Sequence, residues 1–100
     1  MITEHAILSV IAGEEPAFEA AFAEARPIIA SIPGFRSLTL SRSVESPSDY
    51  LLLVDWDELE DHTVGFRGSA GYVRWAELLH RFYEPFPVVE HFVEVPLTGA

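Results

Sequence analysis

The stretch Trp56–Tyr83, WDELEDHTVGFRGSAGYVRWAELLHRFY, decides how the rest of this 100-residue chain is arranged. It carries both tryptophans, two of the four histidines and three of the six basic residues. It directly follows DYLLLVDW, residues 49–56, the most apolar strand candidate in the sequence. Because its many large side chains cannot all remain in water, the stretch must pack against a sheet formed by other segments. We therefore expect it to form a wall of any ligand pocket.

Two helices are expected within this stretch. Asp57, followed three residues later by Glu60, has the spacing of a capping box and predicts a short helix that ends near residue 64. Glycines then interrupt the pattern, and Ser69 can cap a second helix that continues to about Tyr83. The second helix carries an apolar stripe, which predicts that one of its faces is buried.

The other segments predict four strands and one further helix. The strands are expected at residues 2–12, 35–44, 49–56 and 88–95. The further helix should begin at Pro16, because proline suits the first helical turn. Pro27 predicts that this helix ends near Arg26 or is kinked there, since proline removes a helical hydrogen bond.

The order β-α-β-β-α-β is typical of an α+β protein with the ferredoxin-like fold, a four-stranded antiparallel sheet that carries both helices on one face. A chain of this length has room for one core, so we expect residues 1–100 to form a single domain. The strands at 2–12 and 49–56 are apolar on both faces, however, and the helices cover only one. We therefore expect a homodimer, in which the open sheet face packs on a second copy.

The composition excludes several partners and sites. Sixteen acidic and six basic residues give a net charge of -10, which disfavours nucleic acid and anionic membranes as partners. No apolar run approaches the ~20 residues of a membrane span, and the N-terminus lacks the features of a signal peptide, so we expect a cytoplasmic protein. The absence of cysteine excludes disulfides, thiolate metal sites and cysteine nucleophiles.

Three runs of residues carry a resemblance to a known family. They are WDELEDH at 56–62, FRGS at 66–69 and PVVEHF at 87–92, together with Tyr72 and Trp75. In these residues the chain resembles the antibiotic biosynthesis monooxygenase domain, and the resemblance extends over nearly the whole sequence. It implies a dimeric α+β barrel, made when two ferredoxin-like sheets pack together. Some members of that family oxygenate quinols or anthrone-like polyketides without metal or flavin, because the reduced aromatic substrate itself supplies the electrons to oxygen.

The resemblance therefore implies a monooxygenase that acts on a small aromatic substrate and needs no cofactor. The alternative is a non-catalytic module that binds a small molecule or dimerises on the same fold. A third hypothesis is haem handling through His80. The haem-degrading relatives use an asparagine, a tryptophan and a haem-ligating histidine. This chain has no asparagine, and Trp75 falls near the position of that histidine, which disfavours their mechanism.

His62 is the candidate catalytic base. A neutral imidazole can accept a phenolic proton and leave an electron-rich anion that reacts with oxygen. The alternative is a histidine that caps local backbone or packs on the sheet. His5 and His91 fall on strands expected to be neighbours, but the sequence offers no third ligand. We therefore assign them structural roles and expect no metal site.

Five further residues are candidates for substrate binding: Phe66, Arg67, Tyr72, Trp75 and Phe22. The guanidinium of Arg67 could hold a phenolate or carboxylate, although in so acidic a chain it could equally form an ion pair. The four aromatic side chains could line a flat pocket between helices and sheet. They could also be core residues, because aromatic residues at helical spacing usually are.

Overall fold

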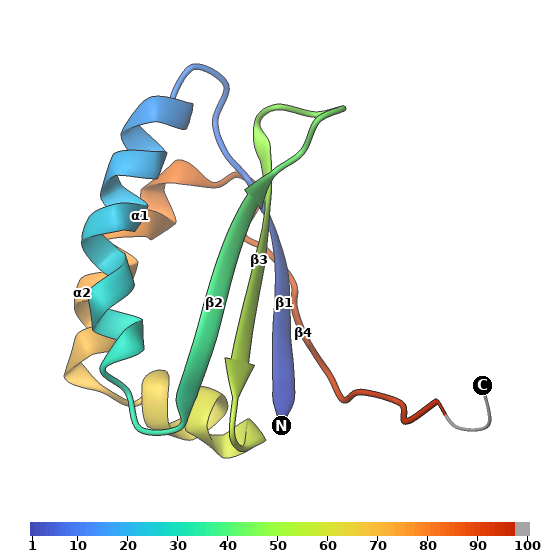
Figure 1. Ribbon diagram of the computed structural model, residues 1–100. Helices are drawn as coiled ribbons and strands as arrows, with labels where there is room; N and C mark the ends of the chain where they lie inside the picture. Colours follow the sequence, from blue (N-terminus) through green and yellow to red (C-terminus); the bar gives the residue numbers. More distant parts are fainter. Residues whose placement is uncertain (98–100) are drawn as a thin grey trace.

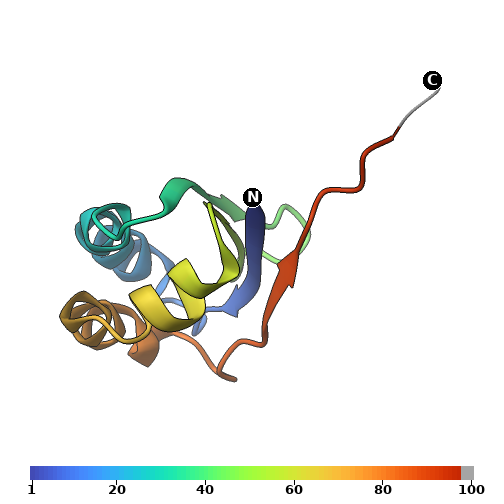
Figure 2. The same ribbon diagram turned by 90° about the horizontal axis from the view of Figure 1, so that it is seen from below.

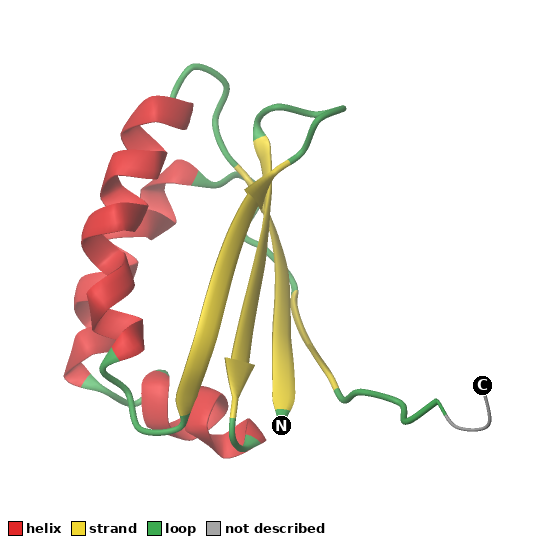
Figure 3. Cartoon of the chain, in the orientation of Figure 1, coloured by secondary structure: helices red, strands yellow, loops and turns green. Residues whose placement is uncertain are grey.

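The computed structural model describes residues 1–97, and its helices all lie on one face of an antiparallel sheet (Figure 1). The elements in chain order are β1 (Ile2–Ser9), α1 (Glu15–Ala30), β2 (Phe35–Arg42), β3 (Asp49–Trp56), the π-helix η1 (Asp61–Phe66), α2 (Ala70–Leu79), the 3-10 helix η2 (His80–Phe82) and β4 (Val89–Phe92). The strands lie in the order β2-β3-β1-β4, and every neighbouring pair is antiparallel. This two-layer arrangement, clear in Figure 3, confirms the ferredoxin-like fold.

The strand register separates the sheet into a covered face and an open face. Ala6 of β1 lies opposite Leu52 of β3, and both are buried beneath the helices. Their neighbours in sequence point the other way, where His5 lies opposite Leu53 and where Ile7 is 44% exposed. Figure 2 shows that the helices of residues 1–97 leave this second face uncovered. The open face is therefore partly apolar and in contact with solvent in the single chain.

Helix α1 is longer than predicted. It continues through Pro27 to Ala30 and does not end near Arg26. Pro27 lies on the exposed side of the helix, so the carbonyl that loses its hydrogen-bond donor can be solvated by water. Ile29, in the turn after the proline, is fully buried. Its packing against the core stabilises the last turn despite the missing hydrogen bond.

The segment after β3 begins differently from the prediction. Asp57 forms an ion pair with Arg36 and does not cap a helix, so the capping-box prediction was wrong. The carboxylate of Asp61 instead accepts a hydrogen bond from the Glu58 N–H at 2.9 Å. The helical segment that follows is a π-helix, a rare element that often occurs at functional sites. It buries both of its aromatic side chains, His62 and Phe66, next to Trp56.

The cap of α2 agrees with the prediction, whereas the length of the last strand does not. The Ser69 hydroxyl accepts a hydrogen bond from the Tyr72 N–H at 3.1 Å. Strand β4 spans four residues, not the predicted 88–95. Its last residue, Phe92, pairs with Thr3, so the N-terminus of β1 offers almost no further backbone for pairing. Residues 93–97 accordingly extend away from the sheet (Figure 1).

Candidate active site

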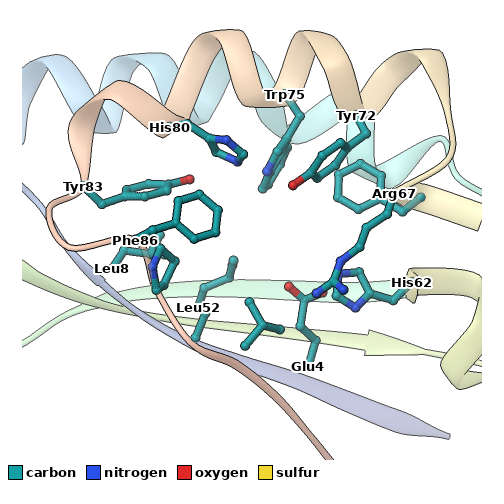
Figure 4. A pocket seen from close by; sticks show the side chains of 14 residues that line it. Glu4, Leu8, Leu52, His62, Arg67, Tyr72, Trp75, His80, Tyr83 and Phe86 are labelled. Carbon is teal, nitrogen blue, oxygen red and sulfur yellow. The ribbon is translucent and has the colours of Figure 1, made fainter. Parts of the chain in front are cut away.

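A cavity of about 360 Å³ lies between α2 and the covered face of the sheet (Figure 4). Its aromatic wall is formed by Phe66, Tyr72, Trp75, Tyr83 and Phe86. Its floor on the sheet is formed by Ala6, Leu8, Leu52 and Val89. Polar groups gather at one end, where Glu4, His62 and Arg67 lie together. Flat apolar walls with a few convergent polar groups are typical of small-molecule sites.

Glu4 is the centre of the polar end. Its side chain is buried, and its Oε1 accepts a hydrogen bond from Trp56 Nε1 at 3.0 Å. The same oxygen lies 3.4 Å from His62 Nε2. On the far side of the imidazole ring, His62 Nδ1 lies 2.8 Å from His91 Nε2, which is hydrogen-bonding distance. Side chains from β1, β3, η1 and β4 thus form one continuous polar chain.

The strand register brings these residues together. Glu4 in β1 lies opposite Val54 in β3 and opposite His91 in β4, so a carboxylate and an imidazole are neighbours on the covered face. The π-helix then places the ring of His62 over the sheet, between Glu4 and His91. Each polar contact joins residues that are far apart in sequence, Glu4 with Trp56, Glu4 with His62 and His62 with His91, so the tertiary fold creates the cluster.

Burial controls the protonation of the cluster. It raises the pKa of Glu4, although the hydrogen bond from Trp56 and the positive charge of Arg67 act in the opposite direction. Burial also lowers the pKa of His62 to about 3, and the charges of Arg67 and His91 add to the effect. The pKa of His91 is lowered by burial and by Arg67. Near neutral pH, His62 is therefore a neutral imidazole and a weak base.

Arg67 supplies the positive charge at this end of the cavity. Figure 4 shows its side chain extending toward His62 and Glu4. Within residues 1–97 it forms no ion pair with a carboxylate, whereas three other arginines do. An ion pair, the alternative role considered for Arg67, is therefore not present in residues 1–97. Its planar guanidinium is available to an anionic group in the cavity.

The residues predicted from the sequence fall into two groups. Those that line the cavity are His62, Phe66, Arg67, Tyr72 and Trp75. Phe22 lies in the core, where its ring packs edge-on against Trp75 at a centroid distance of 5.5 Å. We therefore leave Phe22 out of the site proposed below. His80 lines the cavity away from the polar end, among the rings of Tyr72, Tyr83 and Phe86.

Two members of the polar chain are not predicted from the sequence as site residues. The sequence does not single out Glu4, and it predicts a structural role for His91. A signal for Glu4 exists, because it falls in phase with Ala6 and Leu8 on the side of β1 that is buried. A carboxylate on a buried face needs a polar partner. His91 carries no such signal, because its contact depends on the pairing of β4 with β1.

Residues 1–97 contain neither a metal-binding cluster nor a membrane-spanning helix. No cluster of three or more His, Asp or Glu side chains in this range is arranged to hold a metal ion. None of the helices there is long and apolar enough to cross a membrane. In addition to Glu4 and His62 of the polar chain, four titratable residues line the cavity: Arg67, Tyr72, His80 and Tyr83.

The fold and the cavity together define a ferredoxin-like α+β protein with an aromatic-walled site that contains a buried acid–base pair. The family profile described as antibiotic biosynthesis monooxygenase matches residues 1–78, and the chain belongs to that family. The sequence is 53% identical over 95 residues to the uncharacterised protein YczJ of Bacillus subtilis (strain 168). That alignment covers 95% of this chain and 100% of YczJ.

Solved structures share the fold over nearly the full chain. A candidate antibiotic biosynthesis monooxygenase from Bordetella bronchiseptica has a TM-score of 0.90 at 38% identity, covering 95% of this chain and 97% of its own. SnoaB, a cofactor-independent oxygenase from Streptomyces nogalater, has a TM-score of 0.83 at 21% identity, covering 96% and 94%. At this identity, the likeness to SnoaB shows a common fold and not a common substrate.

Proposed function

We propose that the protein is a cofactor-independent monooxygenase of a small aromatic substrate that carries an acidic phenol or an activated methylene group, as in quinols and anthrones. The observation that carries this proposal is the position of a buried carboxylate and imidazole at one end of an aromatic-walled cavity. A flat aromatic ligand fits between such walls. A proton acceptor beside it is what its activation toward oxygen requires. Membership of the family supports oxygen chemistry as the reaction class.

The reaction requires one base and one molecule of oxygen. The Glu4–His62 pair takes a proton from the substrate, and the electron pair of the broken bond stays on the substrate. The resulting anion transfers electrons to O2 and forms a carbon–oxygen bond, which gives a peroxide anion. Return of the proton and loss of water then leave a carbonyl group. A methylene carbon and O2 thus become a ketone carbon and water, and the substrate supplies all the electrons.

The remaining cavity residues have binding roles in this proposal. Arg67 stabilises the negative charge that develops on the substrate oxygen, because a guanidinium can donate two parallel hydrogen bonds to it. Phe66, Tyr72 and Trp75 enclose the rings and exclude water, which strengthens the electrostatic interactions inside the site.

We further propose that the protein acts as a homodimer through the open sheet face. Leu51, Leu53 and Ile7 place apolar groups on that face. The Nδ1 atom of His5, on the same face, is buried without a hydrogen-bond partner among the described residues. A second sheet packed on this face would cover the apolar groups and could supply that partner, which yields the dimeric α+β barrel.

Oxygen uptake tests the proposed reaction. Protein checked to be free of metal and flavin should consume O2 with hydroquinones or anthrones above the autoxidation blank, and should place one 18O atom from 18O2 in the product. Arg67→Gln should lower kcat/KM, whereas Arg74→Gln should leave it unchanged, because Arg74 pairs with Glu24 at the surface. Aromatic ligands that bind without any uptake of oxygen would contradict the proposal and favour a non-catalytic binding module.

A further inference from the structure

We infer that Glu4, and not His62, is the group that takes the proton from the substrate, and that His62 and His91 relay this proton between Glu4 and solvent. The inference rests on the proposed function and identifies the acting atoms within the same site. It follows from three features of the polar chain: the contacts of His62, the free oxygen of Glu4 and the exposure of His91.

Both nitrogens of His62 face protein groups. Nδ1 lies 2.8 Å from His91 Nε2, and Nε2 lies 3.4 Å from Glu4 Oε1. The ring is 3% exposed and is stacked against Trp56, with Phe66 beside it. His62 cannot take a proton from a ligand in the cavity unless one of these contacts breaks. A role inside the polar chain keeps both contacts of the imidazole ring.

Glu4 is placed to meet the ligand. Its hydrogen bond from Trp56 and its close contact with His62 both fall on Oε1, which leaves Oε2 for the cavity. Figure 4 shows the carboxyl group directed toward the cavity. Burial raises the pKa of Glu4 and lowers that of His62 to about 3, so the carboxylate is the stronger base of the two.

The relay moves one proton with no change of oxidation state. The substrate bond to hydrogen breaks, and an O–H bond forms on Glu4. The proton arrives on Oε2, so the carboxyl group must rotate about its Cγ–Cδ bond to bring the O–H to the side of His62. Glu4 then passes its proton to Nε2 of His62, whose Nδ1 proton moves to His91 Nε2. The partly exposed His91 releases its own Nδ1 proton to water. Reversal of these steps returns a proton to the peroxide. His62 is neutral before and after each transfer, which agrees with its low pKa.

Several titratable or hydrogen-bonding groups surround Glu4. The groups that face it are His62 of η1, His91 of β4, Arg67 after η1, the indole of Trp56 in β3, and Tyr72 and Tyr83 across the cavity. Of these, Trp56 and Arg67 lower the pKa of Glu4, against the effect of burial. A test has to follow each member separately.

Imidazole 15N and carboxyl 13C NMR titrations of the ligand-free protein provide that test without any turnover. Glu4→Gln keeps the shape of the side chain and an oxygen that accepts from Trp56. The relay predicts that this variant shifts the His62 Nε2 signal and moves the titration midpoint of His91. Superimposable His62 and His91 titrations in the wild type and in Glu4→Gln would overturn the relay.

Turnover supplies a second readout. Glu4→Gln should lower kcat by at least ~100-fold with little change in KM, whereas Glu24→Gln at the exposed surface should have no effect. His91→Ala should slow turnover less and should recover rate with added imidazole buffer, which a purely structural role would not produce. Wild-type kcat and pH profile in Glu4→Gln would overturn the relay but leave the proposed function. If the wild type itself consumes no oxygen, the proposed function fails, and the NMR titrations decide the relay alone.

Discussion

The imidazole of His62 stacks on the indole of Trp56, with ring centroids 5.6 Å apart and ring planes inclined by 23°. The edge of the same indole donates the hydrogen bond to Glu4. One residue of β3 therefore orients both members of the acid–base pair, the imidazole through its face and the carboxylate through its N–H. Trp56 is fully buried, so the packing of the core determines this geometry before any ligand binds.

Trp56→Phe should destabilise the fold and raise the pKa of Glu4. A phenyl ring keeps a stacking surface but removes the N–H, so a buried carboxylate loses its donor. The lost hydrogen bond to a charged group and the smaller ring should together lower the free energy of unfolding by about 2–4 kcal/mol. Urea denaturation at pH 7 measures this change, and 13C NMR should show a further rise in the pKa of Glu4.

Trp75→Phe is the matched control for this variant. Trp75 is also buried, but it packs on Phe22 and Phe66 and does not donate to Glu4. The control should lose less stability and should leave the pKa of Glu4 unchanged. Equal losses in the two variants, with no change at Glu4, would show that the indole hydrogen bond has no effect on the carboxylate.

The neutral, buried His62 should make the stability of the fold sensitive to acid. Its pKa is about 3 in the folded protein against an ordinary value of 6.5, so the unfolded chain takes up a proton first as the pH falls. The stability that His62 contributes is therefore fully present above pH 6.5 and is lost as the pH falls toward 3. Over the whole window the loss should be on the order of a few kcal/mol. Urea midpoints measured at successive pH values across this window should follow it.

His62→Phe separates this effect from the titration of the many other acidic groups. The phenyl ring can still stack on Trp56 but does not titrate. As the pH falls, the unfolding free energy of the wild type should therefore decrease more than that of the variant. Glu4 contributes with the opposite sign, because its raised pKa gives stability that is lost as the pH rises. Parallel curves for the two proteins would contradict the assigned pKa of His62.

The sheet, the helices and the covered face could be predicted because apolar periodicity is a local property of the chain. Local signals failed where the tertiary environment competed with them. Asp57 pairs with an arginine of β2 and does not cap a helix, and Pro27 is tolerated because it faces water. Within the candidate site, His62 stood out by its place in a distinctive run of residues. Its partners Glu4 and His91 did not, because they approach it only through the pairing of β1 with β4.

Gly34 should not accept a side chain. Its φ is +91°, and a Cβ atom there would overlap the carboxylate of Asp61. That carboxylate accepts a hydrogen bond from the Glu58 N–H, so it cannot move away freely. Gly34→Ala should therefore cost about 2–4 kcal/mol from strain and overlap. Gly13 has a φ of +94° with no atom within 4 Å of an added Cβ, so Gly13→Ala should cost only ~1–2 kcal/mol. Equal losses in thermal unfolding would rule out the overlap.

Leu53 tests the proposed interface on the open face of the sheet. It lies opposite His5 and Thr39 and points away from the helices. Leu53→Asp should keep the helices, seen by circular dichroism, but should weaken a dimer by at least ~100-fold because it buries two unpaired charges. Light scattering after size exclusion measures that change.

Two control variants separate the interface from the core and from the exposed surface. Leu52→Asp should instead unfold the chain, because Leu52 is 4% exposed and lies in the core. Val44→Asp, at a position 88% exposed, should remain dimeric. A folded Leu53→Asp variant that still dimerises at micromolar concentration would place the interface on another surface.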